Sequence, residues 1–493
     1  MSQLRQKATQ SFLWDMLSIF AKQGVSFIVS VFLARLLLPA EFGLAAMALV
    51  FITISQVFAD FGLASALVQN KENTSLTYSS VFYFNLIIGL LLFVFFWLLA
   101  PFIAAFYDDA RITMLVRYLS LGFIINGFNL VQQTILRRNL EFKKITLRAF
   151  VAQFISGSLA IVLAYRGWGV YALVVQNLTG AAIGTALLWQ VTEWKPKLEF
   201  SWPEIKKLSG FSTYVFLNHV TTKLASQLDT LVVGKVFSAA TLGFYSRATS
   251  LNSLVTTFSS TSISRVSFPV LSRLQDDPLR FTGVYFKLLE FVAFVSFGLS
   301  GALIFAGGDL ITILFGRNWE PSVIIFQVLV LKSFTYPVSL LIVSAFWAAG
   351  KAKESFWFGN AGKTIGLLPL VVAIVWGFTP FLYSVVVASI LSWLFSNWSV
   401  TYSFRISFIR QCKIIGLYFL LFASISLFIF MIVDYVLSPF AFPLSGILTG
   451  GIFAAIYISV NFALKTAGHQ TTMEYLLPVL KQAGNRLFFI NKR

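Results

Sequence analysis

Long apolar runs alternate with short polar segments along the whole chain. Each run holds about 20 residues or more, which as a helix is long enough to cross a hydrocarbon core of about 30 Å. The pattern therefore predicts an all-α, polytopic membrane protein with about 14 transmembrane helices. The predicted spans are residues 11–34, 41–69, 79–106, 112–136, 145–165, 169–191, 208–234, 240–270, 281–306, 321–348, 355–376, 379–403, 413–434 and 441–464.

A short internal repeat divides the predicted helices into two groups. Residues 34–50 and 234–250 align without gaps and pair Gly43 with Gly243. Both segments form the turn between the first two helices of a six-helix half, and both halves begin on the same side, so we expect a parallel repeat about an axis along the membrane normal. The predicted organisation is an N-terminal lobe over 1–200, a pseudo-symmetric C-terminal lobe over 201–408, a helix pair over 409–466 and a tail over 467–493.

Composition and charge agree with a membrane protein. Hydrophobic residues make up 58% of the chain and charged residues 11%, whereas soluble domains carry about 25% charged residues. With both termini in the cytoplasm, most Lys and Arg residues fall in cytoplasmic connections, as the positive-inside rule requires. The net charge of +18 is then mostly a topology signal, and no basic patch with interleaved aromatic residues indicates nucleic-acid binding. The predicted outside connections carry only Arg35, Arg111, Arg166, Lys235 and Arg317.

Motifs for catalysis, metals or cofactors are lacking in the sequence. The single cysteine, Cys412, and two histidines cannot form an internal disulfide or a structural zinc site. Residues 357–364, WFGNAGKT, end like a phosphate-binding loop but have a tryptophan where the first glycine is required. The acidic pairs at 108–109 and 276–277 lie in short turns, where solvated charge at a helix end is the simpler interpretation. We therefore expect no catalytic residue, no metal and no cofactor.

Charged side chains inside the apolar runs are the main candidates for function. A charge on a membrane helix costs about 2.5–3.5 kcal/mol and usually faces a partner or a wet cavity. Only four acids share that depth, Asp15, Asp60, Asp229 and Glu290. The excess of cations favours an anionic cargo. The cations are Lys22, Arg117, Lys223, Arg247, Arg265, Lys332 and Lys363.

Four segments, in order along the chain, resemble a known family: FADFGLASALVQNKE (58–72), QLDTLVVGKVFSAATLGFYSRA (227–248), RVSFPVLSRLQDD (265–277) and FGRNWEPSVIIFQVLVL (315–331). The chain is similar to the polysaccharide transporters of the MOP exporter superfamily, in particular the colanic-acid-exporter type of Wzx flippases. The resemblance implies a two-lobed transporter of 14 helices that alternates between inward-open and outward-open forms. The implied cargo is an oligosaccharide repeat unit on undecaprenyl pyrophosphate, moved across a bacterial inner membrane, with membrane lipid, a polysaccharide polymerase and chain-length machinery as partners.

A lipid pyrophosphate carries about two negative charges, which a cationic cavity would stabilise in the membrane. The predicted contacts are Lys22, Lys223, Lys332 and Lys363 near the bilayer centre, with Arg117 and Arg247 in the outer half. For the central lysines, an internal ion pair or snorkelling to the interface is the alternative, and for Arg265 we expect a structural salt bridge. The acids Asp60, Asp229 and Glu290 are candidates for a coupling proton or sodium ion, with structural pairing as the alternative.

Two other functions stay open at this point. A membrane-embedded enzyme of glycan assembly, such as a polymerase, would need a catalytic carboxylate. A small-cation drug exporter of the same superfamily would need an acidic cavity, but cations outnumber acids in the apolar runs. Lipid-linked oligosaccharide export is therefore the favoured prediction.

Overall fold

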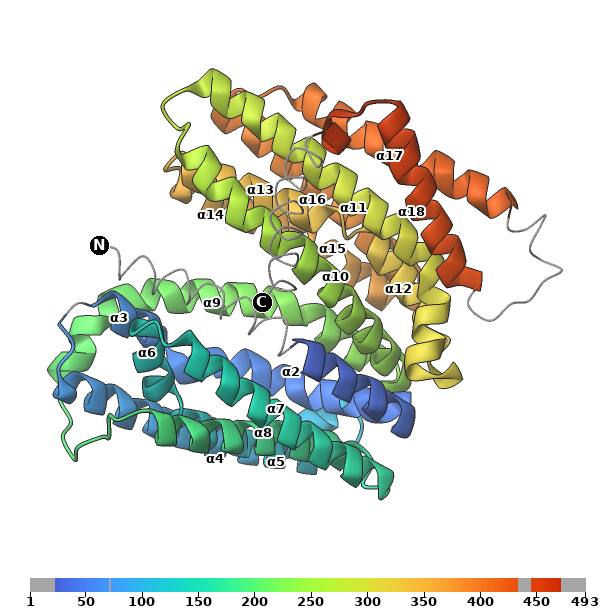
Figure 1. Ribbon diagram of the computed structural model, residues 1–493. Coiled ribbons are helices and arrows are strands. Elements are labelled where there is room, and N and C mark those ends of the chain that lie inside the picture. The colour runs from blue at the N-terminus through green and yellow to red at the C-terminus, as the bar shows by residue number, and fades with distance from the viewer. Residues whose placement is uncertain (1–22, 71, 433–444, 471–493) are drawn as a thin grey trace, which may run out of the picture. The chain divides into compact units, whose positions relative to one another are not determined.

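Long helices make up the protein, as the apolar pattern predicts (Figure 1). The computed structural model describes residues 23–70, 72–432 and 445–470, and no strand occurs in these ranges. Half of the first predicted span, including Asp15 and Lys22, lies outside the described residues; its other half lies in the helix Gln23–Leu36. The chain divides into two compact units, Met1–Ser246 and Arg247–Arg493.

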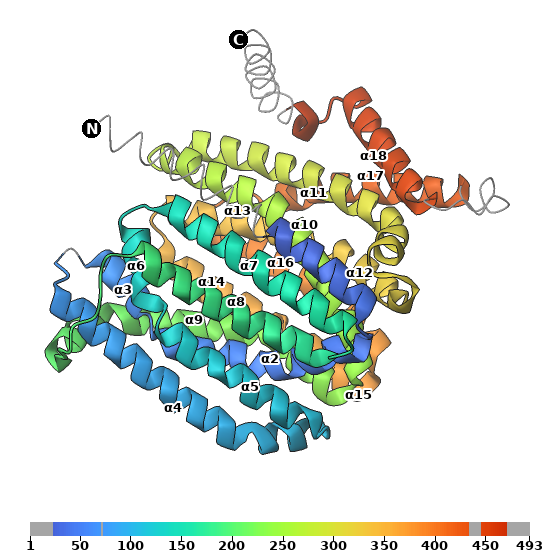
Figure 2. The ribbon, with the colours of Figure 1, turned by 60° about the horizontal axis from the view of Figure 1, so that its bottom comes forward.

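The first unit contains a bundle in which α4 lies beside α5 and α7 lies beside α8 (Figures 1 and 2). Buried serines on α4 also hold the connection that precedes α9, because Ser79 Oγ accepts the Lys197 N–H at 3.1 Å and Ser80 Oγ accepts the Ser201 N–H at 2.9 Å. The helices are α2 (Pro39–Asp60), α3 (Leu63–Gln69), α4 (Ser75–Tyr107), α5 (Arg111–Gly127), α6 (Leu130–Arg138), α7 (Phe142–Tyr165), α8 (Val170–Val191) and α9 (Trp202–Val236).

Helix α10 (Ala239–Ser272) runs across the boundary between the units, and the second unit is built on α11. Its buried core joins α11 to α13, α16, α17 and α18, with Tyr285, Phe346 and Phe453 among the fully buried side chains. The helices are α11 (Pro278–Phe315), the 3-10 turn η1 (Arg317–Trp319), α12 (Ser322–Leu331), α13 (Thr335–Ala348), α14 (Ala352–Ile365), α15 (Leu368–Trp376), α16 (Phe378–Phe404), α17 (Phe408–Ile432) and α18 (Ser445–Ala463).

The predicted spans and the observed helices correspond closely within the described residues. Ten helical segments there are long and apolar enough to cross a membrane, and the bent pair α5 and α6 makes eleven. Helices α9 and α10, of 35 and 34 residues, have the length of spans but richer polar sequences. The total of 14 spans and the lobe boundary at residue 200 remain predictions.

The two glycines paired by the sequence repeat meet in space within the first unit. Gly43, near the start of α2, faces the backbone of Ala239, and Gly243, near the start of α10, faces that of Pro39. A Cβ at either glycine would collide with a carbonyl oxygen of the other helix, so only glycine permits this approach. The two contacts exchange under the offset of the sequence repeat, as expected for segments related by a two-fold axis.

Candidate functional site

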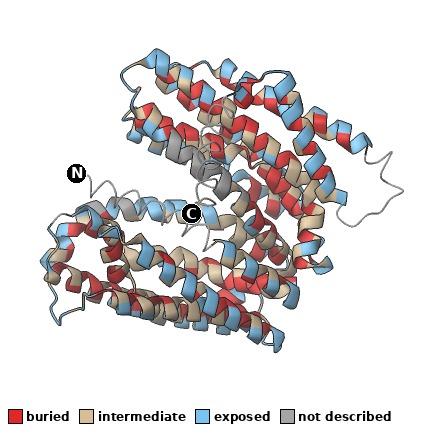
Figure 3. Ribbon diagram, viewed as in Figure 1, coloured by how far each residue is buried: buried red, intermediate tan, exposed pale blue. Residues whose placement is uncertain are grey.

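The predicted cations are distributed over both units. Lys223 lies on α9 in the first unit and is half-buried. None of the described side chains between residues 213 and 232 of α9 is buried (Figure 3). Many of these residues are polar. A membrane helix that exposes polar side chains faces water or a polar partner rather than lipid. The middle of α9 is therefore suited to line an aqueous path.

The other predicted cations have varied surroundings. The Arg117 guanidinium carbon lies 5.2 Å from the centroid of the Trp97 ring, a cation–π contact, and Arg117 Nε donates to the Trp97 carbonyl at 3.4 Å. Lys363 is exposed on α14 and its ammonium donates to Asn360 Oδ1 at 3.3 Å. Arg247 on α10 and Lys332, which caps α12, are half-buried. Lys22 and the side chain of Arg265 lie outside the described residues, so the cationic site as a set stays a prediction.

Two of the three candidate coupling acids accept a hydrogen bond from within the first unit. One Asp60 carboxylate oxygen accepts the Ala64 N–H at 3.0 Å, and Asp229 accepts the Tyr245 hydroxyl at 3.1 Å. Glu290 is half-buried on α11. In the part of the chain that the structure describes, no three His, Cys, Asp or Glu side chains gather as a metal site would require. The coupling role of these acids also remains a prediction.

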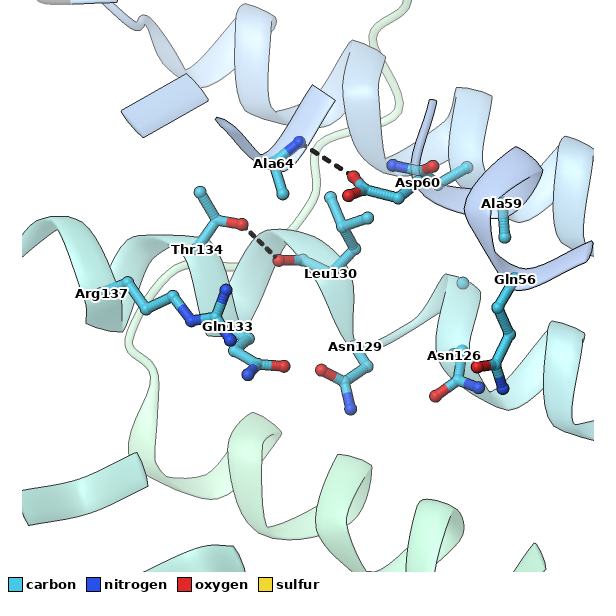
Figure 4. A pocket seen from close by; sticks show the side chains of 12 residues that line it. Gln56, Ala59, Asp60, Ala64, Asn126, Asn129, Leu130, Gln133, Thr134 and Arg137 are labelled. Atoms are coloured by element: carbon cyan, nitrogen blue, oxygen red, sulfur yellow. Dashed lines mark hydrogen bonds between the residues drawn. The ribbon is translucent and has the colours of Figure 1, made fainter. Parts of the chain in front are cut away.

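A polar cavity lies in the first unit, at the end of α2 and beside the break between α5 and α6. Its volume is about 300 Å³, and its wall carries five carboxamides together with one carboxylate and one guanidinium (Figure 4). The side chains of Asn126, Asn129 and Gln133 point toward the same open space (Figure 4). The lining consists of Gln56, Ala59, Asp60, Ala64, Asn85, Asn126, Gly127, Asn129, Leu130, Gln133, Thr134 and Arg137.

Close packing of α4 on α5 brings these amides together. A Cβ on Gly89 would lie 2.7 Å from the Phe123 carbonyl oxygen, and one on Gly127 would lie 3.3 Å from the Leu86 Cα. Glycine at both positions therefore allows the two backbones to approach closely. This contact sets Asn85 of α4 beside the end of α5.

The helix break supplies the rest of the cavity wall. Between α5 and α6 the axis turns by 45°, which leaves carbonyl groups without their helical donors. Trp189 of α8 satisfies one of them, because its indole N–H donates to the Phe128 carbonyl at 3.0 Å. Asn129 Nδ2 and Thr185 Oγ1 lie 3.5 Å apart at the same place. The bend is thus tied to α8, and it orients Asn129 and the first turn of α6.

Hydrogen-bonding capacity in the cavity is largely unused by the protein. Asn85 is 1% exposed, and neither of its amide atoms has a hydrogen-bond partner among the described residues. Carboxamides both donate and accept, and burial of such a group without a partner is costly. One carboxylate and one guanidinium leave the wall formally neutral. The cavity is suited to a neutral ligand with many donors and acceptors.

Sequence reasoning did not identify this cavity. Asn126, Asn129 and Gln133 stand close together in the sequence, but polar residues of this kind occur in many of the predicted helices. The run of amides at 126–133 in an apolar segment was the available signal. Helix packing, which the sequence pattern does not specify, places Asn85 and Asp60 in the same cavity wall as these amides.

Comparison with solved structures defines the class of protein. The fold is similar to that of the lipid II flippase MurJ in an inward closed conformation, with a TM-score of 0.73, 16% sequence identity, and coverage of 92% of this chain and 99% of that one. An inward-facing multidrug resistance MATE family transporter of the MOP superfamily gives a TM-score of 0.59 at 13% identity, covering 80% of this chain and 98% of that one. The chain is a multi-pass membrane protein with the fold of the MOP-superfamily transporters.

Comparison of sequences identifies the family. A family model described as "Polysaccharide biosynthesis protein" matches residues 32–324, and the chain belongs to that family. The lipopolysaccharide biosynthesis protein WzxC of Escherichia coli (strain K12) is 24% identical, covering 75% of each chain. The teichuronic acid biosynthesis protein TuaB of Bacillus subtilis (strain 168) is 23% identical over 76% of this chain and 78% of its own. The succinoglycan biosynthesis transport protein ExoT of Rhizobium meliloti (strain 1021) is 24% identical over 70% of both.

Proposed function

We propose that this protein is a flippase for lipid-linked oligosaccharides, which moves undecaprenyl-pyrophosphate-linked polysaccharide repeat units across the bacterial inner membrane by alternating access. The observation that carries the proposal is membership of the polysaccharide biosynthesis family on a transporter fold similar to that of a lipid II flippase. The protein acts as a transporter and not as an enzyme: the lipid leaves it with its covalent structure unchanged.

The polar head group of such a cargo needs a hydrated route across the membrane, and the chain has features suited to one. A pyrophosphate and a row of sugar hydroxyls cannot enter hydrocarbon without losing their hydration, which costs several kcal/mol for each unpaired polar group. A transporter lowers that barrier when it offers a wet, polar route. The polar, unburied middle of α9 supports such a route, and Lys223 provides a positive charge on it. The lipid tail has no need of this route and stays in the bilayer.

Reconstitution tests the function directly. Purified protein in vesicles is given undecaprenyl-pyrophosphate-linked glycan, and the lipid that becomes accessible on the far leaflet is measured together with its mass. Accelerated movement of a lipid of unchanged mass is the expected result. A lengthened glycan would indicate a polymerase instead, and no acceleration over empty vesicles would overturn the proposal.

Charge removal tests the predicted cationic contacts in cells. Lys22, Lys223 and Lys363 are replaced together by Ala in a strain that lacks the transporter, and surface polysaccharide is measured at matched protein level. We expect a severe loss, whereas Lys207→Ala, on an exposed position of α9 outside the apolar run, serves as the control and keeps export. Full complementation by the triple variant would remove these cations from the mechanism.

A further inference from the structure

The cavity in the first unit has a chemistry different from that of the predicted cationic contacts. Arg137 is its one cationic side chain and Asp60 its one anionic side chain, so the lining has no net formal charge. A pyrophosphate would gain little from such a wall. Carboxamides dominate instead, and each presents a carbonyl acceptor and an NH2 donor on one planar group.

Little of the hydrogen-bonding capacity of these carboxamides is used within the protein. Among the described residues, Asp60 receives the Ala64 N–H and Asn129 lies 3.5 Å from the Thr185 hydroxyl, whereas no hydrogen bond is made by the side chains of Gln56, Asn126 and Gln133. Sugar hydroxyls both donate and accept, as carboxamides do, so the two kinds of group satisfy each other in either direction.

The buried amide of Asn85 adds to the unused hydrogen-bonding capacity of the cavity wall. Asn85 is 1% exposed at the cavity wall, with both amide atoms unpartnered among the described residues. Burial of that amide without a partner is costly, and a ligand in the cavity that completes its hydrogen bonds would offset the cost. The volume of about 300 Å³ lies at the small end of small-molecule sites, and suits one sugar ring rather than a whole repeat unit.

We infer that the cavity between α2, α4 and the α5–α6 break is a sugar-binding subsite, which holds one neutral, hydroxyl-rich ring of the cargo apart from its pyrophosphate. The inference rests on the proposed function, because the sugar arrives on the transported lipid. It adds a source of selectivity: the pyrophosphate contacts are common to all such lipids, whereas the amide cavity distinguishes glycans by the positions of their hydroxyls.

Two lipids separate sugar recognition from head-group recognition. Full-length protein is equilibrated with bare undecaprenyl pyrophosphate, or with glycan-bearing undecaprenyl pyrophosphate extracted from the producing bacterium, and bound lipid is measured by native mass spectrometry. The variants are Asn126→Leu and Gln133→Met, which remove cavity amides. The matched control is Gln132→Met, the same change at the neighbouring residue, whose amide is also buried and unpartnered among the described residues but does not line the cavity.

Each cavity variant should bind the glycan-bearing lipid about three- to tenfold more weakly, the equivalent of one lost hydrogen bond, and should bind the bare lipid as the wild type does. Unchanged binding of the bare lipid also shows that the variant is folded. The control should bind both lipids as the wild type does.

Three results would overturn the subsite: equal weakening for both lipids, no weakening in either cavity variant, or a wild type that binds both lipids equally. The second result would mean that the cavity holds only water. A wild type that binds neither lipid would instead overturn the proposed function, so the two failures are distinguishable.

Discussion

Replacing Asn85 by leucine should stabilise the protein and weaken its recognition of cargo at the same time. Asn85 is 1% exposed on α4, and neither amide atom has a hydrogen-bond partner among the described residues. Leucine has the same number of side-chain heavy atoms and the same branching, so the change removes polarity with little change of shape. The prediction therefore isolates the cost of a buried amide.

The size of the effect follows from that cost. A buried polar group without a partner destabilises a protein by about 1–3 kcal/mol, and the leucine variant should recover an amount of this order. For a unit of about 250 residues, each kcal/mol raises the melting temperature by roughly 2–4 °C. An increase of a few degrees in the ligand-free protein is expected, together with weaker binding of the glycan-bearing lipid.

Thermal unfolding in detergent, followed by the fluorescence of the tryptophans, measures the first effect, and lipid binding measures the second. Gln132→Met is again the control, because it should raise the melting temperature without changing the preference for glycan. A lower melting temperature for Asn85→Leu would refute the reasoning, since it would show that the amide is hydrogen-bonded in the folded protein. A higher melting temperature with unchanged glycan binding would separate Asn85 from the sugar subsite.

Three further predictions concern the scaffold. Gly43→Ala places a Cβ against the Ala239 backbone and should lower the free energy of unfolding by about 1–3 kcal/mol. The control is Gly210→Ala, which has open space around its Cβ and should not lower it. Equal melting temperatures of the two variants would show that the α2–α10 contact is loose. Trp189→Phe removes the donor to the Phe128 carbonyl at the α5–α6 break and should lower the free energy of unfolding by about 0.5–1.5 kcal/mol. It should also weaken binding of the glycan-bearing lipid more than binding of the bare lipid. An unchanged melting temperature would show that this hydrogen bond does not hold the bend. Arg111 donates to Asp109 and holds the pKa of that carboxyl below its ordinary value of 3.8, so the stability from this pair is complete above that value and is lost as the pH falls through the lowered pKa. Because Arg111 is 65% exposed, the difference in unfolding between wild type and Asp109→Asn should be under about 1 kcal/mol at pH 7 and should vanish in strong acid; a difference that grew in acid would contradict this sign.

The internal repeat could be recognised from the sequence, but the contact between its two copies could not. The alignment of 34–50 with 234–250 is sufficient to identify Gly43 and Gly243 as equivalent positions. The structure adds that each glycine packs on the backbone of the other segment. Equivalence is a property of sequence, but the direct contact depends on how α2 and α10 cross.

The cations show the opposite case. Their depth in apolar runs was readable from the sequence, because hydrophobic length determines where a helix crosses a membrane. Their surroundings were not readable: Arg117 stacks on Trp97, twenty positions earlier in the chain, and Lys363 is exposed on α14. Side-chain surroundings depend on which helix faces come together, and apolar runs without a strong polar stripe do not encode that.

The sequence by itself determined the class of protein, the positions of most helices and the family, because length, hydropathy and ordered motifs are local properties of the chain. Only the tertiary structure decided the amide cavity. Its wall combines residues of α2, α4, α5 and α6, brought together by glycine contacts and by a 45° break that Trp189 supports from α8. No local pattern specifies such a convergence, since each amide alone is an ordinary polar residue in an apolar helix.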